Sequence, residues 1–535
     1  MSAFRKLVPV LFVAWFTASS ARAQCEVQTQ EFAPPDVQSG DAFGYRIVRE
    51  GALAVMAAPF DDDRGVDAGA AYVYERDATG WKLAAKLHAS NAAAGAVFGY
   101  SVAITGSTVF VGAPRHDAPS TPLRGMVYAF ERDRNGIWRE VSRLAPPSAV
   151  AGAQYGWSLA AEGDHLLVGM PFPGGVPVLG HALLYVRDSS RLRGWTLEHD
   201  LVAADPATGF DFGHAVAMAG DVIAVAGATE SVVPYADSYV VHVFERGSLG
   251  DWSEVRSLAS PTGTRDLFAY KIALTEDTLV AVAPAELPPT FVYGAVYLYA
   301  RGPGGSDGWG LARRLYSPNA TSGQFTAELC VLSRDWLVAG VPGGGPEGSV
   351  YLFGRNVGGP DTWGEVATLR GEQVEEYSGY GQGLALEGDE LLVGQSGYSF
   401  TDTGGEAYAY DLSRLALSTW RGDSLGMNYD SYEAGRAILG DDFSATVDLG
   451  ITGHPLAVLS WFEHAAEVPL PGGQVLLGAN RLGQMTAAGP VARFELRIPN
   501  VAALCGRTFA TQAAHIGGGL PFVLSNAQDV RIGVR

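Results

Sequence analysis

Phe98–Ala103, which reads FGYSVA, and Val109–Pro114, which reads VFVGAP, decide the fold, because close copies of both recur along the chain. An aromatic residue followed by a small one returns every 55 to 57 residues, as Phe43-Gly44, Phe98-Gly99, Tyr155-Gly156, Phe212-Gly213, Phe268-Ala269, Phe325-Thr326 and Tyr380-Gly381. A tryptophan keeps nearly the same period, at Trp81, Trp138, Trp195, Trp252, Trp309 and Trp363. The aromatic–small pair, the tryptophan and the run that resembles VFVGAP all share one period, which predicts seven copies of a single structural unit.

Each copy is expected to hold four strands. In the second copy they read YSVAIT, TVFVGA, GMVYAFER and WREVSRLA. Turns such as Gly220-Asp221 and Gly388-Asp389 join the first two strands, because Gly and Asp tolerate the left-handed backbone of a tight hairpin. Four antiparallel strands repeated seven times indicate an all-β fold, a seven-bladed β-propeller.

The N-terminal segment is expected to complete the seventh blade, which has only three strands of its own and stops near Ser413. The sequence EVQTQEFAPPD, which begins at Glu26, resembles the fourth strand of blade two, REVSRLAPPS. Phe32 precedes Phe43 by eleven residues, as Leu87 precedes Phe98. We therefore predict that residues 26–34 pair as the outer strand of blade seven and leave the ring with only short protected edges.

These motifs resemble the FG-GAP repeat family, the propeller repeat of integrin α subunits and of many secreted bacterial proteins. The resemblance rests on FGYSVA, on VGAP at Val111–Pro114 and on VYAFER at Val127–Arg132, and it covers residues 26–413. Calcium-binding members carry an Asp-rich loop between the first two strands. Here that loop has only two to four residues in every blade, too few to surround an ion that takes six to eight oxygen ligands, so calcium is not expected at the usual blade positions.

The rest of the chain divides around this propeller, which we assign to residues 24–413. Residues 1–23 are typical of an export signal, with Arg5 and Lys6 before the apolar run Leu7–Phe16 and a small-residue cleavage pattern at Ala21–Ala23. They predict a secreted or cell-surface protein. Residues 414–423 are assigned to a linker, and the alternating runs of residues 424–535 predict a C-terminal β-sandwich.

Composition excludes several function classes. The chain has 535 residues, of which 47% are hydrophobic and 18% charged, which is not the composition of a disordered protein. Its formal net charge of −20 makes nucleic acid an improbable partner, because binding to it requires a basic surface. No run beyond the export signal is apolar enough for a membrane span. Of the three cysteines, Cys330 is expected to be a packed core residue. The sequence alone does not decide whether Cys25 and Cys505 form a disulfide.

No pattern in the chain indicates catalysis or a cofactor. Ser101 and Ser158 stand in Gly-x-Ser sequences, but they fall inside predicted strands, whereas a nucleophile elbow needs a strand-to-helix turn. The ten histidines show no zinc-binding spacing. No pair of carboxylates stands out as the acid and base of a glycosidase. The sequence therefore favours a protein that is not an enzyme and needs no cofactor.

The densest acidic patch lies in the loop between the second and third strands of blade one. Asp61, Asp63 and Asp67 are its candidate metal ligands for a weak cation such as calcium, and the alternative is a solvated loop. As surface residues, each should tolerate replacement by Ala at a cost within about 0.5 kcal/mol.

Loops of this kind gather on one rim of a propeller, and variable loops on a rigid scaffold are common binding sites. We therefore expect a non-enzymatic extracellular binding, adhesion or surface protein whose partner is a protein or glycan. The alternatives are a sialidase-like carbohydrate-active enzyme on the same scaffold and a purely structural surface-layer component.

Overall fold

The computed structural model describes the blades with gaps and the C-terminal region through its strands only. The described residues are 27–117, 123–148, 151–172, 179–188, 194–228, 239–262, 266–284, 294–302, 308–316, 329–342, 348–357, 362–370, 378–397 and 404–415, followed by the strands between Leu417 and Gly533. The expected export signal, Cys25 and Cys505 lie outside them. Among the described residues, no helix combines the length and apolarity that crossing a membrane would require.

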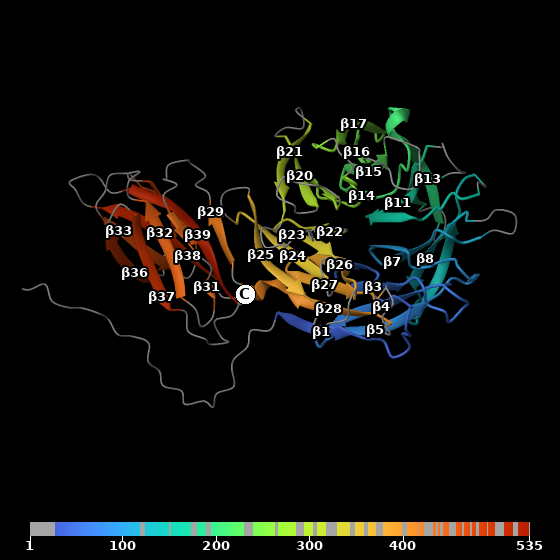
Figure 1. Ribbon diagram of the computed structural model, residues 1–535, viewed down its shortest axis with the longest axis horizontal. Coiled ribbons are helices and arrows are strands. Elements are labelled where there is room, and N and C mark those ends of the chain that lie inside the picture. Colours follow the sequence, from blue (N-terminus) through green and yellow to red (C-terminus); the bar gives the residue numbers. More distant parts are fainter. Residues whose placement is uncertain are drawn as a thin grey trace, which may run out of the picture.

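Seven antiparallel sheets of four strands form the propeller, so the predicted fold class is confirmed (Figure 1). Blade one comprises β2 (Arg46–Glu50), β3 (Leu53–Ala58), β4 (Ala70–Asp77) and β5 (Gly80–Leu87). Blades two to four comprise β6 (Ser101–Thr105), β7 (Thr108–Ala113), β8 (Met126–Arg132), β9 (Trp138–Leu144), β10 (Ser158–Glu162), β11 (His165–Met170), β12 (His181–Asp188), β13 (Gly194–Leu201), β14 (Val216–Ala219), β15 (Val222–Ala228), β16 (Tyr239–Arg246) and β17 (Trp252–Ala259). A 3-10 turn, η1 (Pro206–Thr208), precedes β14.

Blades five to seven continue the same order. Their strands are β18 (Ile272–Leu274), β19 (Thr278–Ala283), β20 (Ala295–Arg301), β21 (Trp309–Leu315), β22 (Leu329–Leu332), β23 (Trp336–Val341), β24 (Ser349–Arg355), β25 (Trp363–Arg370), β26 (Tyr380–Glu387), β27 (Glu390–Gln395) and β28 (Glu406–Asp411), and η2 (Leu412–Arg414) follows. The first strand of each blade is the innermost, and each contacts the first strand of the next blade until β26 meets β2 and closes the ring.

Blade seven takes its outer strand from the start of the described chain. β1 (Gln28–Phe32) pairs antiparallel with β28, with Phe32 opposite Ala407 and Gln28 opposite Tyr410. The Phe32 side chain is buried, and its ring lies 5.0 Å from that of Tyr74 in blade one. The Gln30 side chain donates to the carbonyl of Trp81 at 2.7 Å and accepts from its N–H at 2.9 Å. The strand therefore holds blades seven and one together.

The repeated glycines meet where neighbouring blades touch. A side chain at Gly112, in the VGAP motif of blade two, would collide with the carbonyl oxygen of Gly156, in the aromatic–Gly pair of blade three. Gly156 itself has a positive φ of 85°, a backbone state that residues with a side chain rarely adopt. The same approach recurs at the other end of the ring, where Gly394 of blade seven faces Gly44 of blade one. The close approach of neighbouring blades thus requires glycine both in the VGAP motif and in the aromatic–Gly pair.

The tryptophan that recurs with the repeat also makes contacts between neighbouring blades. The Trp81 indole donates to Glu390 of the preceding blade at 3.2 Å, and Arg76 lies 2.6 Å from the same carboxylate. Blade two repeats this contact, in which both Trp138 and Arg132 reach Glu75. In blades one, two and five, a tryptophan and an arginine therefore contact one carboxylate of the preceding blade, whereas the indole nitrogens of Trp195 and Trp252 have no hydrogen-bond partner among the described residues.

The C-terminal strands, orange and red in Figure 1, form three further sheets. Their orders are β29-β39-β38-β33-β36 with β31 beside β39, β30-β32-β37, and β34-β35. The strands are β29 (Leu417–Arg421), β30 (Tyr432–Ala434), β31 (Ala437–Ile438), β32 (Asp442–Asp448), β33 (Leu456–Phe462), β34 (Ala465–Leu470), β35 (Gly473–Leu477), β36 (Arg481–Ala488), β37 (Val491–Arg497), β38 (Thr508–Ile516) and β39 (Val523–Gly533).

One of these strands lies where the sequence pattern places a linker. β29 falls within residues 414–423, and its pairing with β39 means that the C-terminal sheets begin at Leu417. The packing of these sheets as a β-sandwich stays a prediction.

Candidate binding face of the propeller

One face of the propeller carries both the acidic loop of blade one and the beginnings of the innermost strands. In blade one, Arg46 at the start of β2 pairs with Ala57 near the end of β3. The loop that follows β3 therefore emerges on the same side as the start of β2. The same pairing holds in blade two, where Ser101 is opposite Gly112. We call this side the loop face.

The acidic loop does not behave as a uniformly solvated segment. Asp61 is only 1% exposed, and its Oδ1 accepts from the N–H of Asp63 at 3.1 Å. Asp62 and Asp63 are exposed, and Asp62 Oδ1 accepts from the N–H of Asp67 at 2.8 Å. The expectation that all three candidate ligands are interchangeable surface residues is therefore wrong for Asp61, whose carboxylate is turned into the protein.

An ammonium group of the chain itself lies among these carboxylates. Lys86 Nζ is 2.7 Å from Asp61 Oδ2, 2.7 Å from Asp63 Oδ2 and 2.9 Å from Asp36 Oδ2. It also lies 5.0 Å from the centre of the Tyr72 ring. The hydrogen bond from Lys86 holds the pKa of Asp63 below its usual value, and the carboxylates and Tyr72 raise the pKa of Lys86 despite the opposing effect of burial.

This arrangement is a poor fit for a metal ion with Asp61, Asp63 and Asp67 as ligands. Lys86 sits where a cation would, its third carboxylate partner is Asp36 rather than Asp67, and the described residues contain no cluster of three or more acidic, His or Cys side chains placed to hold a metal. The contact between Asp36 and Lys86 could not be predicted from the sequence, because Asp36 lies far from the acidic loop along the chain. The cation site stays a prediction, which the next experiment tests.

We expect the melting temperature of the protein to be the same in millimolar calcium chloride and in EDTA. Lys86 already occupies the position between the carboxylates that a metal ion would take. A ligand at 100 times its dissociation constant would add about 2.7 kcal/mol to the free energy of unfolding, an effect that scanning calorimetry detects readily. A calcium-dependent rise would restore the acidic loop as a metal site.

A neighbouring carboxyl group gives a prediction about pH. Asp41 is 4% exposed and accepts from the N–H of Gln38 at 2.7 Å. Burial raises its pKa to about 6, and the charges of Asp61 and Asp62 add to this while the Gln38 N–H opposes it. Because the folded-state pKa lies above the unfolded one, the protein loses stability as pH rises and Asp41 ionises.

Asp41→Asn should therefore stabilise the protein, with a gain that grows between pH 4 and pH 6 and is constant above. Thermal melts at pH 4.5 and pH 7.5 would measure it, with Asp164→Asn, at an exposed turn of blade three, as the control. An equal gain at both pH values would contradict the argument.

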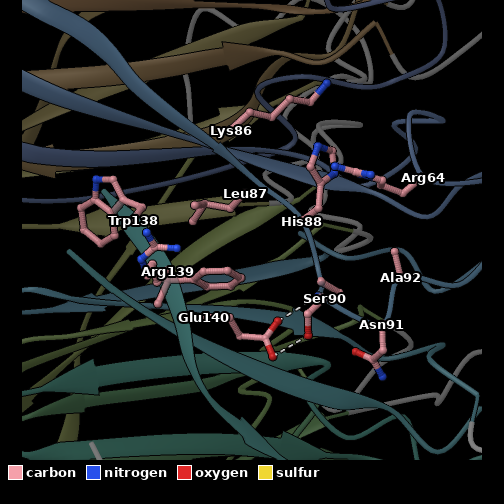
Figure 2. A pocket seen from close by; sticks show the side chains of 12 residues that line it. Arg64, Lys86, Leu87, His88, Ser90, Asn91, Ala92, Trp138, Arg139 and Glu140 are labelled. Carbon is pink, nitrogen blue, oxygen red and sulfur yellow. Dashed lines mark hydrogen bonds between the residues drawn. The ribbon is translucent and has the colours of Figure 1, made fainter. Parts of the chain in front are cut away.

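A groove of about 730 Å³ opens between the outer strands of blades one and two (Figure 2). Its polar lining includes Arg64, Lys86, His88, Arg139 and Glu140. Figure 2 shows Glu140 accepting two hydrogen bonds from Ser90, from its N–H and its hydroxyl, both at 2.8 Å. Arg139 lies 2.7 Å from Asp133, so several of the charges in the groove already serve internal contacts.

A chain of aromatic rings follows the innermost strands on the loop face. Each ring belongs to the residue directly after an aromatic–small pair in blades one to five: Tyr45, Tyr100, Trp157, His214 and Tyr270. Successive ring centres are 5.7, 4.6, 5.9 and 5.4 Å apart. We call these five residues the aromatic arc. Their identity is visible in the sequence, one position before the serines that a search for nucleophiles singles out.

Side chains of the loop face pack against the aromatic arc from outside. Phe60, in the loop after β3, lies 6.2 Å from Tyr45, and Phe172, after β11, lies 5.9 Å from Trp157. Tyr239, the first residue of β16, lies 5.2 Å from His214. The arc is therefore continuous with the loops that differ most between blades.

A cation stands at each end of the aromatic arc. The Arg46 guanidinium lies 4.4 Å from the centre of the Tyr45 ring and donates to the carbonyl of Gln382 in blade seven at 3.1 Å. Lys271 Nζ lies 5.7 Å from the centre of the Tyr270 ring. Burial lowers the pKa of Lys271 to about 7, and the charge of Arg46 lowers it further. The charge of one cation is thus felt by the other.

The two serines of the Gly-x-Ser sequences make contacts between blades. Ser101 Oγ donates to the carbonyl of Gly156 at 2.6 Å, and Ser158 Oγ donates to the carbonyl of Gly213 at 2.6 Å. At the equivalent position the other blades carry Arg46, Ala215, Lys271, Glu328 and Gly383, of which Glu328 lies outside the described residues. The serine hydroxyls therefore have a structural role in the seams between blades.

The closed ring of four-stranded blades, with a repeat unit that sets each seam, defines a repeat-built β-propeller. A family model described as FG-GAP repeat matches residues 27–74, 81–130 and 195–244. The chain therefore contains FG-GAP repeats within a seven-bladed β-propeller. A comparison with curated proteins found no match.

Proposed function

We propose that the protein is a secreted, non-enzymatic binding or adhesion protein that captures an extracellular protein or glycan on the loop face of its propeller. The observation that carries the proposal is the aromatic arc. Ligand sites are typically lined by apolar and aromatic side chains with a few placed polar groups, and the arc has five mutually tilted rings in succession with a cation at each end. FG-GAP repeats are typical of extracellular proteins, which supports secretion.

Two contacts favour binding over catalysis. The hydroxyl groups of Ser101 and Ser158 each donate a hydrogen bond to a backbone carbonyl of the next blade, so neither serine is placed to act as a nucleophile. Of the acidic residues on the loop face, Asp61 and Asp63 are engaged by Lys86. A glycosidase would need two carboxyl groups facing a shared substrate. Surface-layer assembly, the structural alternative, would need no selective ligand.

An array of glycans and extracellular proteins, probed with the purified protein, tests the proposal. We expect a selective ligand whose binding is weakened at least tenfold by Trp157→Ala and is unchanged by Tyr316→Ala, which removes an aromatic side chain that is 52% exposed and lies outside the arc. Circular dichroism melts of both variants would establish that they fold. Cleavage of a bound glycan, or binding indifferent to Trp157, would contradict the proposal.

A further inference from the structure

We propose that the aromatic arc is a saccharide site selective for sugars that carry a carboxylate, such as uronic acid residues. The inference rests on the proposed function and adds the chemical class of the ligand. It follows from the combination of ring faces, unpaired polar atoms and cations at one place on the loop face, and each of these is argued in turn.

The aromatic arc offers ring faces to a ligand. Tyr100, Trp157 and Tyr270 are half-buried, so they keep exposed surface while their positions are fixed by the neighbouring rings. The face of an aromatic ring carries negative charge density, which suits the partly positive C–H groups on one face of a sugar ring. Several such faces in sequence match a chain of sugar residues better than a single small molecule.

Polar atoms without protein partners lie between these rings. His214 is 7% exposed, and neither of its ring nitrogens has a hydrogen-bond partner within the described part of the chain. The indole Nε1 of Trp157 is likewise buried and unpaired there. A buried polar group without a partner destabilises a protein, and sugar hydroxyls, which both donate and accept, would supply the missing partners.

The cations select the charge of the ligand. Neither Arg46 nor Lys271 forms an ion pair with a carboxylate of the described residues, although the chain as a whole has a net charge of −20. Arg46 also has N–H groups beyond those that reach Tyr45 and Gln382, and the planar guanidinium matches a carboxylate with two parallel hydrogen bonds. A cationic ligand, which aromatic faces would otherwise attract, meets two like charges here.

The groups around Lys271 make its charge responsive to pH. The pKa of Lys271 is about 7, that of His214 is lowered to about 3 mainly by burial, and that of Cys330 is raised to about 12 by burial. His214 and Cys330 are thus neutral between pH 6 and pH 8.5, and Arg46 stays positive, so Lys271 is the group of this set that changes charge. An anionic ligand should bind more weakly as pH rises through 7 and Lys271 loses its proton.

Isothermal titration of the full-length protein tests the proposal with defined probes. The probes are tetrasaccharides of galacturonate, glucuronate and mannuronate, each compared with its carboxyl-reduced, neutral counterpart at low salt. We expect at least one acidic probe to bind tenfold or more tightly than its counterpart. Arg46→Gln should remove most of that preference, because the acidic probe loses more affinity than its neutral counterpart, whereas Trp157→Ala should weaken both probes by a similar factor.

Variants of Lys271 provide the second arm. Lys271→Gln should weaken binding of the acidic probe, and Lys271→Arg should retain the affinity while abolishing its decline between pH 6 and pH 8.5. Neutral probes that bind as well as acidic ones at the aromatic arc would overturn the carboxylate selectivity and leave the proposed function standing. Binding of an acidic probe that Arg46→Gln and Trp157→Ala do not affect would overturn the site itself.

Discussion

Removal of residues 24–36 should leave a protein that aggregates and melts at a much lower temperature than the parent. The deletion takes away β1 and with it every main-chain partner on the outer side of β28. An exposed edge strand pairs readily with other chains. Size-exclusion chromatography with light scattering and thermal melts would measure both effects.

Two point variants separate the loss of the edge from the loss of packing. Phe32→Ala keeps the strand but removes a buried ring that touches Tyr74, and it should cost about 3–5 kcal/mol. Glu31→Ala, at the neighbouring exposed position, should cost less than about 0.5 kcal/mol. A truncated protein that stays monomeric and melts like the parent would show that β1 is dispensable.

Lys86→Met should destabilise the protein by about 3 kcal/mol, because it leaves the Asp61 carboxylate, whose side chain is 2% exposed, without a counter-charge. The matched control is Lys82→Met on the same strand. There the ion pair with Asp77 has side chains that are 61% and 49% exposed, so its loss should be nearly silent. Urea unfolding of the two variants gives the comparison, and equal costs would refute the role of Lys86.

The same variant should gain a response to calcium that the parent lacks. Without the ammonium group, the carboxylates of Asp36, Asp61 and Asp63 surround a site of the right charge for a divalent ion, and oxygen ligands suit calcium. Millimolar calcium should therefore raise the melting temperature of Lys86→Met, and EDTA should reverse the rise. Potassium chloride at equal ionic strength controls for screening.

The propeller could be predicted from the sequence because its blades repeat the same local constraints. Gly112 and Gly156 recur with the repeat since their backbones approach each other across a seam, and the indoles of Trp81, Trp138 and Trp309 each reach a carboxylate of the preceding blade. Each of these recurring residues makes a contact between neighbouring blades, so the spacing of the residues along the chain equals the length of one blade.

The candidate site was harder to predict because its contacts join residues that are distant in sequence. Lys86 stands on β5 with nothing in its neighbourhood to show that its ammonium reaches Asp36 and the acidic loop. The aromatic arc occupies one position of the repeat, at Tyr45, Tyr100, Trp157, His214 and Tyr270, just as the core residues occupy theirs. Recurrence alone therefore does not separate the residues of the proposed binding site from those of the scaffold.

The pairing of β1 with β28 also sets the order in which the molecule can be completed. The hydroxyl of Thr29 donates to the carbonyl of Ala409 at a sequence separation of 380 residues, so β1 waits until almost the whole propeller has been synthesised before it finds its partner. Contacts of such long range form slowly. Closure of the ring should thus be a late kinetic step, and the propeller would gain its final stability only once its two distant ends have met.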